Sequence, residues 1–207
     1  EIAIGLSADE VNALDNQTTF SNGSEADVEI FSSTYSESNS STWSALNGAT
    51  YYVSGDIFIS GELSIAAGAV FEMEEDVFWT VNGVIDVNGT SSEHVIFTSA
   101  NVAAQINWGG IFIQSSNTLN SFDYAEILEA GGAIASYGPI DATQVRAALG
   151  GDYIEYKVSL TNSIISGSGG YGLYIDDFGG ELETFANNTF TDNQTDIGLP
   201  ANEVDAL

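Results

Sequence analysis

The residues best suited to bind a ligand gather around position 176. Asp176 and Asp177 are adjacent, and Glu181 and Glu183 follow shortly after them. Carboxylate oxygens, together with backbone carbonyls, are the ligands that Ca²⁺ prefers in proteins. Asp176 and Asp177 are therefore candidate calcium ligands. The chain has no EF-hand loop and no calcium-binding Gly-Asp repeat, so the alternative is solvated surface charge with no cofactor.

Two tyrosines precede this acidic pair. Tyr171 and Tyr174 come just before Asp176, and an aromatic ring with a polar tip suits stacking against a sugar. We take Tyr171 and Tyr174 as the candidate binding residues. Packing in the core is the alternative for most aromatic residues, and it is the one we expect for Trp79, which falls on an apolar position of the repeat described below.

Basic residues are almost absent. Arg146 and Lys157 are the only two, and His94 is the sole histidine. His94 could act as a general base, but its position between Glu93 and Val95 favours a histidine at the surface or at a strand edge.

The charge balance excludes several classes of partner. Thirty Asp and Glu against two Lys and Arg give a net charge of −28. Such a surface repels nucleic acid and anionic lipid and stays soluble in salt. It indicates an extracellular or saline setting, marine or halophilic. The chain has no Cys for disulfides and no run of about 18 apolar residues that could span a membrane.

The elements that must position these residues are short strands that repeat. The apolar and glycine positions of 57–65 recur at an offset of 22, so that Ile57 corresponds to Trp79 and Leu63 to Ile85. Ile85 and Val87 recur again, at an offset of 26, as Ile111 and Ile113. A repeat of about 20–30 residues is the length of one coil in a solenoid, whose units must stack to bury their apolar faces.

The repeat is interrupted once and then resumes. Residues 131–153 depart from it, and within them 141–149 have the N-cap, capping-box and terminal glycine signals of a short helix. Beyond them, Leu160 recurs as Phe185, at an offset of 25, and Gly172 recurs as Gly198, at an offset of 26. Asn162 and Asn187 fall in register, which suggests an internal asparagine stack. The alternative, which we favour, is that these side chains satisfy backbone groups at a turn.

These observations divide the chain into three regions. Residues 1–48 are rich in Ser, Thr and Asn and indicate an N-terminal cap or linker, with a capping box at Ser7–Glu10 and one or two helical turns after it. Residues 49–199 form the stacked coils with the insertion at about 131–153. Residues 200–207 are an acidic tail.

The repeating segments resemble those of right-handed parallel β-helix proteins, the pectate-lyase-like architecture, and in particular β-helix segments of bacterial secreted and cell-surface proteins. The resemblance covers about residues 49–199 and implies an all-β solenoid. The segments that carry it are 55–68, 81–90, 95–99 and 108–111.

The resemblance points less clearly to an activity. Pectate-type lyases use a basic residue beside calcium, and only Arg146 and Lys157 could serve here. Polygalacturonase-like hydrolases combine aspartates with Gly-His-Gly and Arg-x-Lys elements, and here only the pair Asp176–Asp177 corresponds. The leading hypothesis is therefore a non-catalytic module with a structural, adhesive or glycan-contacting role, secreted or at the cell surface. The alternative is a polysaccharide hydrolase or lyase with an acidic groove at Asp176 and Asp177.

Expected partners follow from the same reasoning. A polysaccharide or another surface protein is expected, and nucleic acid and membrane insertion are not. Self-association through the ends of the solenoid is also expected, because an open coil exposes apolar side chains and strand edges.

Overall fold

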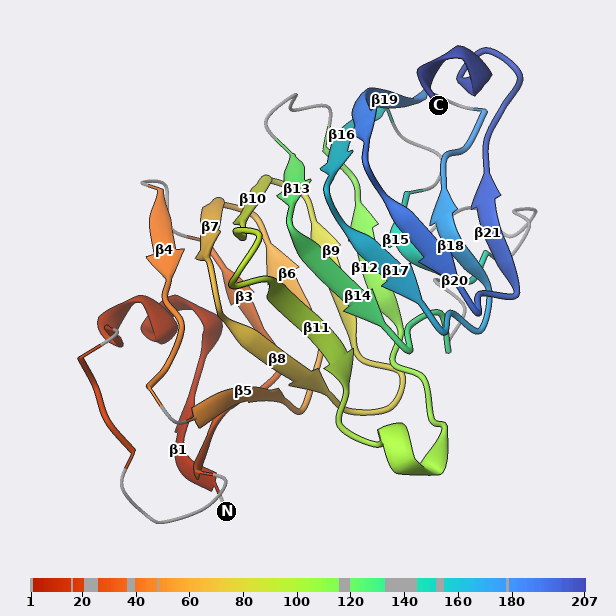
Figure 1. Cartoon of the computed structure of the whole chain (residues 1–207). Helices are drawn as coiled ribbons and strands as arrows, with labels where there is room; N and C mark the ends of the chain where they lie inside the picture. Colours follow the sequence, from red (N-terminus) through yellow and green to blue (C-terminus); the bar gives the residue numbers. More distant parts are fainter. Residues whose placement is uncertain are drawn as a thin grey trace.

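The chain folds into a parallel β-helix whose complete coils each contribute one strand to each of three sheets (Figure 1). The computed structural model describes residues 2–15, 17–20, 26–36, 40–47, 49–115, 120–132, 145–151, 155–177 and 179–207. Within these ranges the strands pair in parallel throughout, so the predicted all-β solenoid is confirmed.

From β2 onward, successive strands belong to the eight-stranded, the seven-stranded and the six-stranded sheet in turn. The eight-stranded sheet contains β1 (Ile2–Leu6), β2 (Ala26–Ile30), β5 (Ala49–Val53), β8 (Val70–Met73), β11 (Val95–Ser99), β14 (Ala125–Leu128), β17 (Ile164–Ser166) and β20 (Thr189–Thr191). The seven-stranded sheet contains β3 (Ser33–Tyr35), β6 (Ile57–Ile59), β9 (Phe78–Val81), β12 (Gly110–Ile113), β15 (Ala147–Gly150), β18 (Tyr171–Tyr174) and β21 (Thr195–Gly198). The six-stranded sheet contains β4 (Ser41–Trp43), β7 (Glu62–Ala66), β10 (Val84–Asn88), β13 (Ser121–Asp123), β16 (Tyr156–Thr161) and β19 (Gly180–Ala186).

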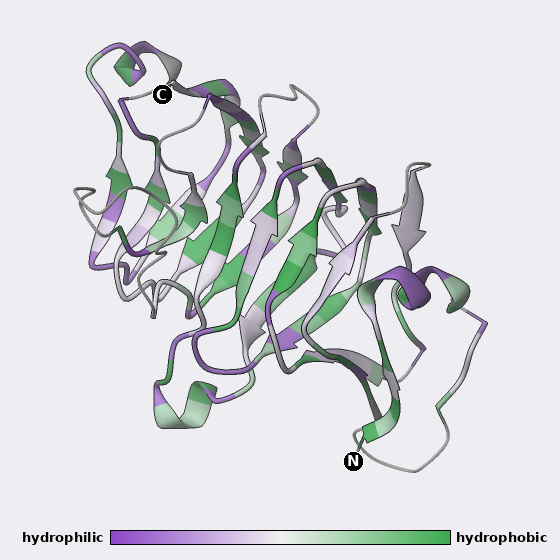
Figure 2. Cartoon of the chain, turned by 180° about the vertical axis from the view of Figure 1, so that it is seen from behind, coloured by the Kyte–Doolittle hydropathy of each residue, from purple (hydrophilic) through white to green (hydrophobic). Residues whose placement is uncertain are grey.

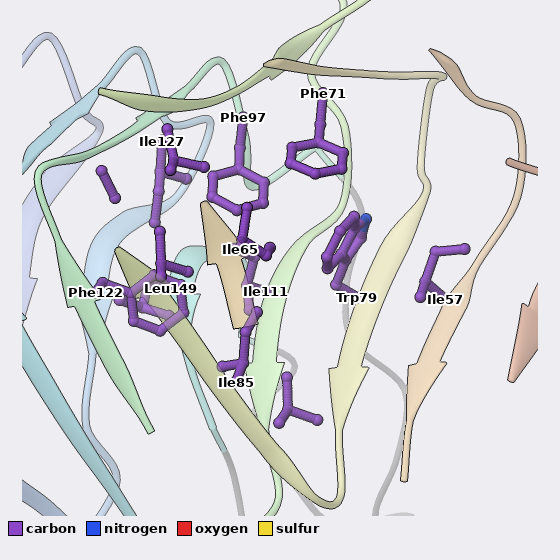
Figure 3. Close-up of a cluster of buried hydrophobic side chains, with 14 of the residues drawn as sticks. Ile57, Ile65, Phe71, Trp79, Ile85, Phe97, Ile111, Phe122, Ile127 and Leu149 are labelled. Carbon is purple, nitrogen blue, oxygen red and sulfur yellow. The ribbon is translucent and has the colours of Figure 1, made fainter. Parts of the chain in front are cut away.

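The core consists of columns of inward-facing side chains, because in-register parallel strands place equivalent residues above one another. In the eight-stranded sheet Tyr51, Phe71 and Phe97 form one such column, with ring centroids 4.8 and 5.2 Å apart and rings nearly parallel. The Trp79 ring meets Phe71 edge-on at 5.2 Å and is fully buried, as its place in the repeat predicts (Figure 3). Figure 2 shows the hydrophobic residues along the strands and the polar ones at the turns.

The pairing confirms two of the predicted offsets and corrects two others. Ile57 pairs with Trp79, and Leu160 with Phe185, at the predicted offsets of 22 and 25. The predicted match of Ile85 with Ile111 is wrong, because Ile111 belongs to another sheet and pairs with Trp79. After β11 the chain contains an additional segment with the 3₁₀ turn η2 (Val102–Ala104). The coil from β9 to β12 is therefore longer than the coil from β6 to β9.

The second corrected offset lies at the C-terminal coil. The partner of Gly198 is Tyr174 and not Gly172, so this coil is shorter than the sequence repeat predicts.

The predicted helix over 141–149 is replaced by a strand where the structure describes it. Residues 147–150 form β15, which pairs with β12 and β18, and residues 141–144 lie outside the described ranges. Ala147, Ala148 and Leu149 favour a helix in isolation. Pairing on both sides and complete burial of all three side chains override that preference.

The N-terminal region contributes to the solenoid as well as capping it. Strands β2, β3 and β4 already belong to the three sheets, so the stack begins before residue 49. The 3₁₀ helix η1 (Ala8–Ala13) contacts β3 and β4 and buries Ala8 and Val11 completely. It starts at the predicted capping box, where the Glu10 carboxylate accepts hydrogen bonds from the Ser7 backbone N–H at 2.9 Å and hydroxyl at 2.8 Å. These bonds lower the pKa of Glu10.

The C-terminal tail makes a further turn. The 3₁₀ turn η3 (Val204–Ala206) packs on β19. Of the helical segments that the structure describes, none has the length and apolar character needed to cross a bilayer.

The corner between the six-stranded and eight-stranded sheets is built from stacked residues with positive φ. Tyr124, Asn162 and Asn187 occupy equivalent corners with φ of 48°, 52° and 57°. The Asn187 amide donates to the Asn162 side chain at 3.1 Å, and the Asn162 amide donates to Asp123 at 2.7 Å. The asparagine stack is confirmed, but it lies at the surface and not in the interior, since Asn162 is half-buried and Asn187 is exposed.

The Tyr156 hydroxyl holds the segment that follows β18. It accepts the Asp176 backbone N–H at 3.2 Å and lies 3.1 and 3.2 Å from the carbonyls of Tyr174 and Gly151, to which it can donate. The ring is fully buried, and this burial raises the pKa of the phenol.

Replacing Phe71 by Ala tests the stacked aromatic column. We expect the free energy of unfolding to fall by about 3–5 kcal/mol, because a cavity opens between the Tyr51 and Phe97 rings. Urea denaturation followed by circular dichroism measures it. The matched control Phe31→Ala removes a ring that is 44% exposed and should change stability by about 0.5 kcal/mol or less. Equal losses in the two variants would contradict this account of the core.

Replacing Tyr156 by Phe tests the buried hydroxyl. The change keeps the ring but leaves the Asp176 N–H without its acceptor, so the free energy of unfolding should fall by about 1–3 kcal/mol. Tyr171→Phe removes a hydroxyl from a half-buried ring and serves as the control in the same denaturation assay. A Tyr156→Phe variant as stable as the control would show that this hydroxyl does not stabilise the segment that follows β18.

Candidate functional site

The two candidate tyrosines lie together on a surface groove of the seven-stranded sheet. Tyr171 and Tyr174 are the first and last residues of β18, with ring centroids 5.1 Å apart and planes inclined by 46°. Both are half-buried. The groove has a volume of about 370 Å³, and its lining includes Val145, Arg146, Gly170, Tyr171, Tyr174, Gln194 and Thr195.

A glycine on the neighbouring strand makes room for the ring pair. Gly198 of β21 pairs with Tyr174. A Cβ atom on Gly198 would lie 2.7 Å from Cε1 of Tyr171 and 3.1 Å from Cδ2 of Tyr174. Both distances are shorter than ordinary van der Waals contact, so a larger residue at 198 would displace the rings.

Arg146 completes the groove, although the sequence analysis considered it only as the basic residue of a lyase and not as a binding residue. The residue is exposed and directly precedes β15, and its carbonyl accepts the Tyr171 N–H at 2.8 Å. Because a helix was expected at 141–149, no signal in the sequence placed Arg146 beside β18. Only the pairing of β15 with β18 brings the two together.

The two basic side chains of the protein are in opposite electrostatic situations. Lys157 forms ion pairs with Glu183 at 2.8 Å and Glu181 at 2.9 Å, and its hydrogen bonds to Glu183 and then Glu181 raise its pKa. In the part of the chain that the structure describes, no carboxylate lies within 4 Å of the Arg146 guanidinium. The groove therefore offers a guanidinium that other described side chains do not neutralise.

This combination of groups suits a sugar. Aromatic rings stack on the apolar face of a pyranose, and a guanidinium donates several hydrogen bonds in one plane to hydroxyl or carboxylate oxygens. Gln194 and Thr195 add exposed polar side chains. The lining residues described for the groove include no carboxyl group that could act as an acid or base.

Asp176 and Asp177 differ in burial and in the contacts that the structure describes. The Asp176 side chain is 2% exposed, and its Oδ1 accepts the Gly180 N–H at 3.1 Å, which closes the turn between β18 and β19. Asp177 is exposed. A buried carboxylate that accepts a backbone hydrogen bond is engaged in holding the turn.

The calcium site stays a prediction. Among the described residues, no three His, Asp or Glu side chains come together as a metal-binding group. Asp176 and Asp177 are the residues that a calcium titration would have to test.

His94 lies at the surface, directly before β11. Its Nδ1 is 2.7 Å from Oε1 of Glu126 on the next coil, and both side chains are about one-quarter exposed. The contact joins β14 to the residue before β11, so it ties two coils together.

A second groove lies on the six-stranded sheet and is acidic. Its lining includes Glu62, Val84, Asp86 and Ser121. Both Asp86 oxygens are engaged, Oδ1 by the Ser121 hydroxyl and Oδ2 by the Asn88 amide at 2.7 Å. The described lining has no aromatic ring and no basic group, so the groove at Tyr171 and Tyr174 is the better candidate.

Comparison with known proteins agrees with the fold. The family model described as a pectate-lyase-like β-helix domain matches residues 13–157. No curated protein and no solved structure matches the chain. The match spans most of the sequence, from η1 through the start of β16, and the coils beyond it continue the same three sheets. This chain therefore belongs to the pectate-lyase-like β-helix domain family.

Proposed function

We propose that this protein is a non-catalytic β-helix module that contacts glycans through the groove lined by Arg146, Tyr171 and Tyr174. The observation that carries the proposal is the pair of half-buried tyrosine rings beside a guanidinium that no described carboxylate neutralises. Its role is structural or adhesive, since binding without turnover holds a surface or a matrix together.

The disposition of the acidic residues supports a binding role. In the enzymatic alternative, Asp176 and Asp177 would act on a polysaccharide from one groove. Asp176 instead accepts a backbone hydrogen bond within its own turn, and its side chain is buried. General acid–base catalysis needs a carboxyl within hydrogen-bond reach of the substrate.

The charge of the chain supports a place outside the cell. A net charge of −28 destabilises the folded chain through self-repulsion, and salt screens that repulsion, so saline surroundings favour the folded state. We therefore infer a secreted or cell-surface location, with polysaccharides or other surface proteins as partners.

Affinity electrophoresis in gels containing polygalacturonate, alginate or a neutral β-glucan tests the proposal. We expect at least one polysaccharide to retard the wild-type protein. Tyr171→Ala should weaken that binding about tenfold, or about 1.4 kcal/mol, because a stacking surface is lost. Phe31→Ala removes an exposed ring that does not line the groove, so this variant should bind as the wild type does.

A second pair of variants separates the roles of the two basic residues. Arg146→Gln should weaken binding of an acidic polysaccharide more than of a neutral one, because a charge-assisted hydrogen bond is lost. Lys157→Gln should leave both unchanged, because Lys157 is already paired with two glutamates. Unretarded migration of the wild type in all three gels would refute glycan binding. New reducing ends or unsaturated products, abolished by Asp177→Ala, would establish the enzymatic alternative.

A further inference from the structure

Among the described residues, the eight-stranded sheet is the one sheet whose edge strand is uncovered at each of the two ends of the solenoid. At the N-terminal end η1 lies against β3 and β4, the edge strands of the other two sheets. At the C-terminal end η3 packs on β19, and the Glu203 carboxylate accepts the Leu182 N–H of that strand at 3.1 Å. Neither cap covers β1 or β20, which end the eight-stranded sheet on opposite sides (Figure 1).

The backbone groups at these two edges are complementary. Leu6 of β1 uses its carbonyl to accept the Phe31 N–H, on the side of β2. Since alternate residues of a parallel strand bond to opposite sides, Gly5 turns its N–H and C=O toward the open edge. On β20, the Thr189 N–H and the Thr191 carbonyl bond toward β17, so Phe190 turns its backbone groups outward.

The side chains at these ends are apolar where a surface strand would be expected to be polar. In the described part of the chain, three large hydrophobic residues are exposed at or beside the β1 edge, with exposures of 42% for Ile2, 39% for Ile4 and 44% for Phe31. At the other end the Phe185 and Phe190 rings stack at 6.0 Å on the last coil and are only half-buried. A typical end coil of a solenoid carries a polar outer face instead.

We propose that a second copy of this chain docks head to tail, with β1 of one molecule pairing in parallel with β20 of another. All strands of the sheet run in the same direction, so this junction continues the same parallel ladder without any reversal. Because the two surfaces differ, the contact is heterologous and the assembly is open-ended. The inference does not depend on the proposed glycan contact.

Electrostatics sets the conditions for assembly. Two chains with a net charge of −28 repel each other at low ionic strength. In about 1 M salt the Debye length falls to about 3 Å, so this repulsion is screened while strand pairing and apolar contact remain. Association should therefore strengthen at least tenfold from low salt to 1 M NaCl.

Sedimentation velocity of the wild type and of two variants at Gly5 tests the junction. A Cβ at Gly5 has room, since its nearest neighbour would be Oε2 of Glu29 at 3.8 Å. Gly5→Ala should assemble as the wild type does. Gly5→Pro removes the outward N–H and places a ring at the edge. In the absence of wild-type protein this variant should therefore remain monomeric. Thermal melting of the two variants verifies that both are folded.

Mixing the Gly5→Pro variant with the wild type tests whether the contact is head to tail. Gly5→Pro keeps an intact β20, so a small amount added to the wild type should cap growth and shorten the assemblies. Dimers of Gly5→Pro alone would overturn the head-to-tail junction. Wild-type assemblies whose size does not change when Gly5→Pro is added would overturn it as well. Either result would indicate contacts between like ends or elsewhere on the surface. A wild-type protein that remains monomeric in 1 M NaCl would overturn self-association altogether.

Discussion

Parallel stacking in register is the constraint on which the rest of this structure depends. Each strand hydrogen-bonds to its equivalents in the coils before and after, so equivalent side chains must share one environment. The column of Tyr51, Phe71 and Phe97 shows the consequence, since three large rings stack at separations close to the distance between strands. A change in one ring is felt by its neighbours in both directions, because each coil buries its apolar face only against the next.

The same constraint explains what could be predicted from the sequence. Offsets of 22 and 25 are correct where consecutive coils have the same corners, as from Ile57 to Trp79 and from Leu160 to Phe185. The match of Ile85 with Ile111 failed because hydrophobic alternation identifies a strand but not its sheet. An excursion such as the one containing η2 leaves the strands intact and changes only the chain length between them.

The candidate site shows a different limit of prediction. Tyr171 and Tyr174 could be selected from the sequence because both lie next to the acidic pair Asp176 and Asp177. Arg146 could not, because its proximity to Tyr171 follows from a pairing across an interruption of the repeat. Local propensity pointed to a helix there, and the burial of Ala147 and Leu149 between two strands outweighed it. Residues that meet only across coils need the register, which single-sequence patterns do not supply at an insertion.

Charge and architecture together explain why we propose the groove at Arg146, Tyr171 and Tyr174 as the binding site. On a surface with a net charge of −28, a ligand with negatively charged oxygens is repelled almost everywhere. Lys157 cannot offset this, because Glu181 and Glu183 hold it. The Arg146 guanidinium lowers that barrier locally, and the adjacent Tyr171 and Tyr174 rings add contact that salt does not screen. The glycan binding proposed for this groove should therefore persist in saline surroundings, where contacts made by charge alone would weaken.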